Sequence, residues 1–82
     1  MSFNPSNVKI LENGEHFVGV YHRDHARIEV KLNFREQGRV RLLVSVNGKV
    51  LEDIELRLPT TNSLSAKMHA TALIMSAVER NS

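Results

Sequence analysis

The chain has 82 residues, a formal net charge of +2 and no cysteine, so disulfide bonds and thiolate zinc sites are excluded. This length allows one domain, residues 1–82, whose single small core leaves a narrow margin of stability. Because self-association is a common way to enlarge such a core, we expect a homodimer.

The N-terminal residues, Met1 to Pro5, have neither the basic stretch nor the apolar stretch of a secretory signal peptide. Elsewhere, no apolar run approaches the ~20 residues that a membrane-spanning helix needs. We therefore expect a cytoplasmic protein that does not engage a membrane.

Turn-forming residues separate strand-like segments over most of the chain, near 7–12, 15–22, 25–35, 39–46 and 49–58. Asn13-Gly14 and Asn47-Gly48 favour two-residue hairpin turns, because both residue types tolerate the positive φ of a type I′ turn. Residues 36–38 suit a three-residue loop that ends in glycine. The pattern predicts an antiparallel β-meander of four to five strands.

The third and fourth segments alternate most regularly, with apolar residues at Ala26, Ile28, Val30, Leu32, Phe34, Val40, Leu42, Val44 and Val46. A period of two predicts strands that each have one buried face. A three-residue loop between the segments pairs Phe34 with Val40 and Leu32 with Leu42, so the register agrees with the burial. This agreement makes the hairpin the best-defined part of the predicted sheet.

Two segments depart from this alternation. The fifth keeps Ile54 and Leu56 on its apolar face only with an extra residue near 51–53, which predicts a β-bulge. The second is apolar on both sides, with Phe17 on one side and Val18 on the other. It is therefore either a central strand covered on both faces or part of an interface.

One α-helix over about 63–80 is predicted to pack on one face of the sheet, which gives an α+β fold. Its apolar arc is about twice as wide as the ~100° stripe that a helix on one sheet requires. The bulky edge, which includes Met68 and Val78, is expected to face the sheet. The small-residue edge is expected to form the dimer interface through Ala66, Ala70, Leu73 and Ala77. The alternative is that a small domain wraps its own strands around the helix.

The polar face of the third to fifth segments is the expected partner-binding surface, with Arg27, Lys31, Arg35, Arg39, Arg41 and Arg57. Arg35 and Arg39 face each other across the loop, where a bound anion would relieve their repulsion. The alternative is a solvated face with cross-strand ion pairs, such as those of Arg27 or Lys31 with the neighbours of Glu29. A net charge of only +2 and few aromatic residues favour a protein over a nucleic acid as the partner.

No pattern in the sequence is typical of an active site or a metal site. The histidines are His16, His22, His25 and His69, and their spacing matches no recognised ligand set. No serine lies in a G-x-S-x-G turn, and no glycine-rich phosphate loop is present. Glu52 and Asp53 are adjacent on a strand and are expected to point to opposite faces, unless the predicted bulge turns them. We therefore expect no enzymatic activity, no cofactor, no metal and no small-molecule substrate.

The predicted order of elements, a β-meander followed by one helix, resembles that of small single-stranded-DNA-binding dimers such as the positive-cofactor-4-like and whirly families. The resemblance covers the order of elements alone, so no functional residue follows from it. We expect a small non-enzymatic binding or regulatory protein, a homodimer that binds and modulates a protein partner. Accessory and inhibitor proteins of phages or other bacterial mobile elements are of this kind. The alternative is a single-stranded nucleic-acid-binding dimer that uses the arginine-bearing sheet face.

Overall fold

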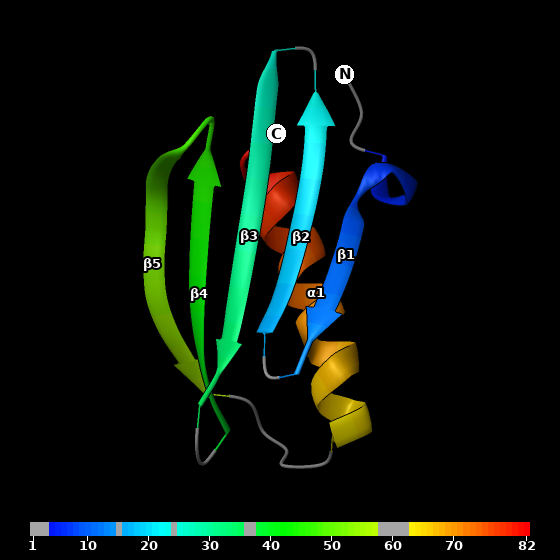
Figure 1. The fold of residues 1–82 in the computed structure, drawn as a ribbon, viewed down its shortest axis with the longest axis vertical. Coiled ribbons are helices and arrows are strands. Elements are labelled where there is room, and N and C mark those ends of the chain that lie inside the picture. Colours follow the sequence, from blue (N-terminus) through cyan, green and yellow to red (C-terminus); the bar gives the residue numbers. More distant parts are fainter. Residues whose placement is uncertain (1–3, 15, 24, 36–37, 58–62) are drawn as a thin grey trace.

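The computed structural model describes residues 4–14, 16–23, 25–35, 38–57 and 63–82. Its elements are a short 3-10 helix, η1 (Pro5–Asn7), the strands β1 (Lys9–Asn13), β2 (His16–Arg23), β3 (Ala26–Phe34), β4 (Arg39–Val46) and β5 (Lys49–Arg57), and the helix α1 (Ser63–Arg80). The strands form one antiparallel sheet in the order β1-β2-β3-β4-β5, and α1 packs on one face of it, against β2 and β3 (Figure 1). The predicted α+β meander with one C-terminal helix is confirmed.

The turns lie close to their predicted positions. Asn47 and Gly48 have φ angles of 53° and 86°, as the predicted type I′ turn requires. The first hairpin differs by one residue, because Asn13 still pairs with His16 in the ladder and Gly14, with φ 61°, begins the loop. This shift does not change which side chains of β1 and β2 lie on each face of the sheet. The loop at 36–38 is closed by Arg35, whose backbone N–H donates to the carbonyl of Arg39 at 2.7 Å.

The predicted register of the central hairpin is confirmed, since Phe34 pairs with Val40 and Leu32 with Leu42. Between β4 and β5, Val44 pairs with Glu52, whereas Ser45 pairs with Val50. Leu51 is therefore the extra residue of the predicted β-bulge. The bulge turns Glu52 toward the helix side of the sheet and leaves the side chain of Val50 on the opposite side.

The core lies between α1 and the sheet, and its buried residues are Phe17, Tyr21, Ile28, Val30, Leu32, Val40, Leu42, Val44, Ala70, Ile74, Ala77 and Val78. The close approach of helix and sheet depends on Gly19 in β2, because a Cβ at Gly19 would lie 2.3 Å from Cγ2 of Ile74. Small side chains on α1 fit such a short separation.

The predicted orientation of α1 is wrong for its small-residue edge and for Met68, whereas Val78 of the bulky edge is buried in the core as predicted. Ala70 and Ala77 are fully buried against their own sheet, and Leu73 is partly buried against the same core, whereas Met68 on the bulky edge is 69% exposed. The side chain of Ala66 lies outside the described part of the chain. The small-residue edge fills the interface between α1 and its sheet, so Ala70 and Ala77 are not available to a partner.

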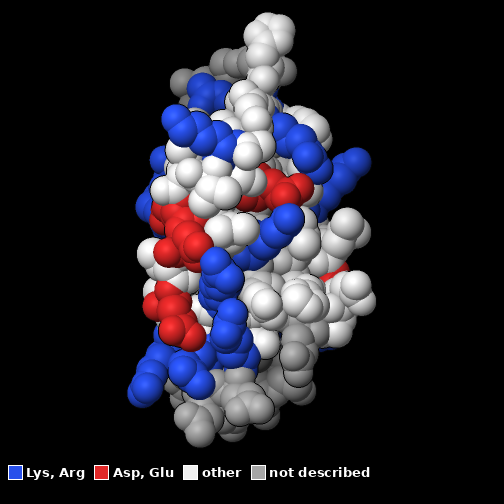
Figure 2. Space-filling model, turned by 60° about the vertical axis from the view of Figure 1, so that its left-hand side comes forward, with Lys and Arg blue, Asp and Glu red and all other residues white. Residues whose placement is uncertain are grey.

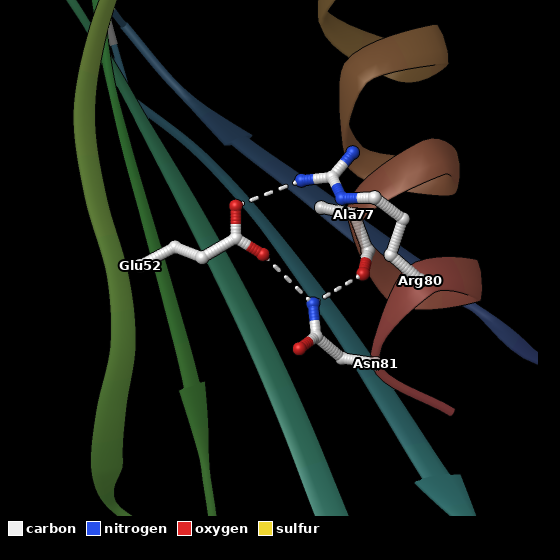
Figure 3. Close-up of polar contacts among 4 residues, drawn as sticks. All are labelled: Glu52, Ala77, Arg80 and Asn81. Carbon is white, nitrogen blue, oxygen red and sulfur yellow. Dashed lines mark hydrogen bonds and ion pairs between the residues drawn. The ribbon is translucent and has the colours of Figure 1, made fainter.

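The C-terminal end of α1 is joined to β5 by polar contacts of Glu52 (Figure 3). Nη2 of Arg80 donates to Oε1 of Glu52 at 2.9 Å, and Nδ2 of Asn81 donates to Oε2 at 3.1 Å. Asn81 also donates to the carbonyl of Ala77 at 2.8 Å, which satisfies one of the open carbonyls at the helix end. Hydrogen bonds from Asn81 and Arg80 lower the pKa of Glu52 below its ordinary value of 4.5, although partial desolvation opposes them.

Replacing Glu52 by glutamine should lower the free energy of unfolding at neutral pH by roughly 0.5–1 kcal/mol, because the charge-assisted bond to Arg80 is lost. A carboxyl group with a lowered folded-state pKa stabilises the fold above pH 4.5 and loses this contribution as the pH falls through the folded-state value. Glu52→Gln should therefore lose less stability than the wild type between neutral pH and about pH 3 in urea unfolding monitored by circular dichroism.

Glu79→Gln is the matched control, because Glu79 is an exposed carboxylate on α1 that forms no ion pair with the described residues. It should keep the acid sensitivity of the wild type. Equal acid sensitivity in Glu52→Gln and the wild type would contradict a structural role for this contact.

Candidate binding surface

The sheet face opposite α1 is called here the open face, because no described element lies over it (Figure 1). Directly paired residues of an antiparallel sheet share a face, so the register defines its composition. One row across the strands comprises Lys9, Val20, Glu29, Ser45 and Val50. The next comprises Leu11, Val18, Lys31, Leu43 and Asp53, and the third comprises Asn13, His16, Asn33, Arg41 and Glu55.

All six basic residues predicted to bind a partner lie on the open face, and Arg27, Lys31 and Arg41 pair there with carboxylates. Glu29 contacts Nη2 of Arg27 at 3.2 Å and Nζ of Lys31 at 3.4 Å. Asp53 accepts two hydrogen bonds from Arg41, at 2.9 Å to Nε and 2.7 Å to Nη2. This bond from Arg41 lowers the pKa of Asp53 below its ordinary 3.8. For these three residues the structure supports the predicted alternative of a solvated, ion-paired face.

The other three basic residues, Arg35, Arg39 and Arg57, lie side by side at one end of the open face and are called here the arginine row. Arg39 pairs directly with Arg57, and the backbone of Arg35 is bonded to that of Arg39. Directly opposite residues of this kind have Cβ atoms about 5 Å apart, so the side chains of the row begin close together. Figure 2 shows basic side chains at the upper end, through the middle and at the lower end of the molecule, with acidic ones along its left margin and in its upper centre.

The open face also carries apolar side chains, which lie on the strands to either side of the polar strand β3. The sequence pattern revealed them only in part. Leu11 and Val50 are 67% and 54% exposed, and Val18, Val20 and Leu43 are half-buried. The sequence pattern identified the side of β2 that carries Val18 as apolar. Leu43 was missed, although it occupies a position of β4 that alternation assigns to the polar face. An exposed leucine or valine is ordinary by itself, but several together on an uncovered face are typical of an interaction surface.

A shallow hollow of about 210 Å³ lies on this face between β2 and β4. Its lining includes Val18 and Leu43, bordered by Lys31, His16, Asn33 and Arg41. The hollow therefore combines an apolar floor with a polar and mostly basic rim, and it offers room for an aliphatic side chain.

The histidines and the adjacent acidic residues do not form a common site. His16 and His22 lie on the open face, whereas His69 lies on α1, behind the sheet. Among the described residues, no group of three or more His, Cys, Asp or Glu side chains is placed to hold a metal ion. Glu52 and Asp53 point to opposite faces of the sheet, as predicted from their adjacent positions.

None of the helices within the described ranges is long and apolar enough to cross a membrane. Comparison with known proteins finds no matching family model, no matching curated protein and no matching solved structure.

Proposed function

We propose that the protein is a non-enzymatic binding protein that docks a protein partner on its open face and modulates the partner by occupying it. The observation that carries this proposal is the anatomy of that face. Apolar side chains at Val18 and Leu43 flank Lys31 among charged and mostly basic side chains, and no described element covers them. Interfaces between proteins commonly have an apolar centre, a polar rim and a high content of arginine.

The placement of the aromatic residues favours a protein over a nucleic acid. Phe17 and Tyr21 are buried on the helix side, and Phe34 packs there with a ring-centroid distance of 5.3 Å to Phe17. Among the described residues, the open face therefore has no aromatic side chain on which a base can stack. The arginine row is the observation in favour of single-stranded nucleic acid, which is the second candidate. If the protein self-associates, this proposal places the contact between copies on the open face. The small-residue edge of α1 is not free for it, because the sheet of the same chain covers Ala70 and Ala77.

Affinity capture from an extract of the host cells tests the open face. Leu11→Asp and Leu43→Asp should each abolish capture of a partner that the wild type retains, because both replace an apolar contact residue of the open face by a charged one. Met68→Asp is the matched control and should capture normally, since Met68 is 69% exposed on the helix side and Leu11 is 67% exposed on the open face.

Urea unfolding of each variant checks that the fold is kept. Capture that survives both open-face substitutions, or the absence of any partner specific to the wild type, would contradict the proposal. Loss of the captured material on nuclease treatment, with binding that weakens steeply between 50 and about 200 mM salt, would favour the nucleic-acid candidate instead.

A further inference from the structure

The two outer strands of the sheet, β1 and β5, differ in how their free edges are protected (Figure 1). A free edge offers backbone N–H and C=O groups to another strand, and proteins commonly block it with a bulge or with charged side chains. β5 has a bulge at Leu51 and charged residues at Lys49, Glu52, Asp53, Glu55 and Arg57. β1 pairs with β2 without a bulge, and its charged residues are Lys9 and Glu12. Apart from its short length, β1 is therefore the less protected edge.

The free edge of β1 is accessible. Leu11 is 67% exposed, and Ile10 is the one residue of this strand that is partly buried. A two-residue loop joins β1 to β2, so the pair that closes it, Asn13 with His16, exchanges backbone hydrogen bonds. Such pairs alternate along an antiparallel ladder. The backbone N–H and C=O groups of Ile10 and Glu12 therefore point away from β2, toward the free edge.

Two copies of β1 can pair with each other in only a few registers. Because the outward groups recur at every second residue, antiparallel pairing of identical strands has its two-fold axis at a single residue. An axis at Lys9 or Glu12 places like charges directly opposite each other, which destabilises a sheet. An axis at Ile10 or Asn13 leaves part of the strand unpaired. An axis at Leu11 pairs the whole strand, Lys9 to Asn13.

The register centred on Leu11 also matches side chains of the same character on the open face. Leu11 lies opposite Leu11 of the second copy, in a pair of the kind that brings side chains closest together. Val18 is the neighbour of Leu11 on β2, so apolar side chains of both copies meet at the axis. Lys9 lies opposite Asn13 of the second copy, whose amide oxygen is an acceptor for its ammonium group. The edge is therefore complementary to itself.

We infer that β1 is the contact between two copies of this chain, which pair antiparallel about Leu11 and join their sheets into one. Ile10 and Glu12 lie opposite each other and exchange the backbone hydrogen bonds of the joint. Opposite residues point to the same side of a sheet, so both α1 helices lie on one side and both open faces on the other. This inference goes beyond the proposed function, and the hollow at Leu43 stays uncovered in the pair.

Introduced cysteines test the register, because the chain has no cysteine of its own. Leu11→Cys brings two thiols across the axis with Cβ atoms about 4.5 Å apart, close to the roughly 4 Å of a disulfide. In air-saturated buffer it should form a covalent dimer on a non-reducing gel. Lys9→Cys should react about tenfold more slowly or less, because its two thiols are about 14 Å apart along the strands. Equal rates for the two variants, or faster reaction of Val50→Cys on β5, would overturn the inference.

The mass in solution provides the complementary measurement. In light scattering the wild type should have twice the 9.3 kDa mass of the chain. Glu12→Pro and Glu12→Ala both lose the ion pair of Glu12 with Lys67, at 3.0 Å, but only proline removes the outward N–H. Glu12→Pro should therefore be a monomer and Glu12→Ala a dimer. A wild type that is a monomer at millimolar concentration would overturn the inference.

A second pair of variants leaves the backbone N–H groups in place. Leu11→Lys sets two charges against each other across the axis and should give a monomer with a cooperative urea transition. Val50→Lys is its control, because Val50 is 54% exposed on the open face of the other outer strand, and it should remain a dimer. A Leu11→Lys variant with the mass of a dimer would contradict pairing about Leu11.

These results are distinguishable from failure of the proposed function. Leu43 lies on β4, three strands from β1, so Leu43→Asp should abolish partner capture and leave the dimer intact. If Leu43→Asp loses capture but the wild type is a monomer, the proposed function stands and this inference is wrong. If Leu43→Asp captures normally and the wild type is a dimer through Leu11, the reverse holds.

Discussion

Gly19→Ala should lower the free energy of unfolding by about 1–3 kcal/mol, although it adds a single methyl group. That methyl would meet Cγ2 of Ile74 at 2.3 Å, and Ile74 is fully buried. A β-branched side chain in a helix has one strongly preferred rotamer, so Ile74 cannot simply rotate its Cγ2 away. Relief requires α1 to move off the sheet, which weakens packing along the whole interface. Equilibrium unfolding in urea measures the change.

A double-mutant cycle distinguishes this clash from a general effect of alanine in β2. Ile74→Leu removes the branch at Cβ with little change in volume, so the cost of Gly19→Ala should be smaller in that background. An additive pair, or a Gly19→Ala variant as stable as the wild type, would contradict the close approach of α1 to β2.

Ala70→Arg should leave the protein unfolded or destabilise it by more than about 3 kcal/mol, because a charged side chain would be forced into the core. Ala70 is fully buried between α1 and the sheet. Ala72→Arg is the matched control, since Ala72 is an exposed alanine two residues further along the same helix. It should keep the wild-type far-ultraviolet circular dichroism spectrum and unfolding midpoint.

This pair of variants also decides between the two orientations of α1. If the small-residue edge formed a dimer interface, Ala70→Arg would give a folded monomer from a wild-type dimer in light scattering. The structure predicts loss of folded protein instead. A folded Ala70→Arg variant with half the mass of the wild type would restore the interface that the sequence pattern favoured.

Local features of the chain were determined by the sequence itself. The type I′ turn at Asn47-Gly48 follows from residues that tolerate positive φ, and the register at Phe34 and Val40 follows from the loop length combined with the alternation. The bulge near Leu51 follows from the broken parity of its strand. Each of these depends on neighbours within a few residues, so a one-dimensional pattern contains the necessary information.

The sequence predicted in the same way which face of the sheet is basic. It did not predict which of the basic residues on that face pair with Glu29 or Asp53. Alternation alone assigns Arg41 and Arg57 to one face. Whether each arginine meets a carboxylate depends on diagonal neighbours across strands, as with Arg41 and Asp53, twelve positions apart in sequence. The sequence did not predict that Leu43 lines a hollow, because this depends on the register that brings Leu43 next to Lys31 and near Val18.

The orientation of α1 was decided by tertiary structure alone. The apolar arc of the helix is wide enough to pack on the sheet in more than one way, and its own sequence does not choose between them. The choice depends on Gly19, fifty-five positions before Ile74, which leaves space for the helix to approach β2 closely. Contacts of Glu52 with Arg80 and Asn81 then join the helix end to β5. Local periodicity thus determined the sheet and the extent of the helix, whereas side-chain volume at a distant position determined which helix face is buried.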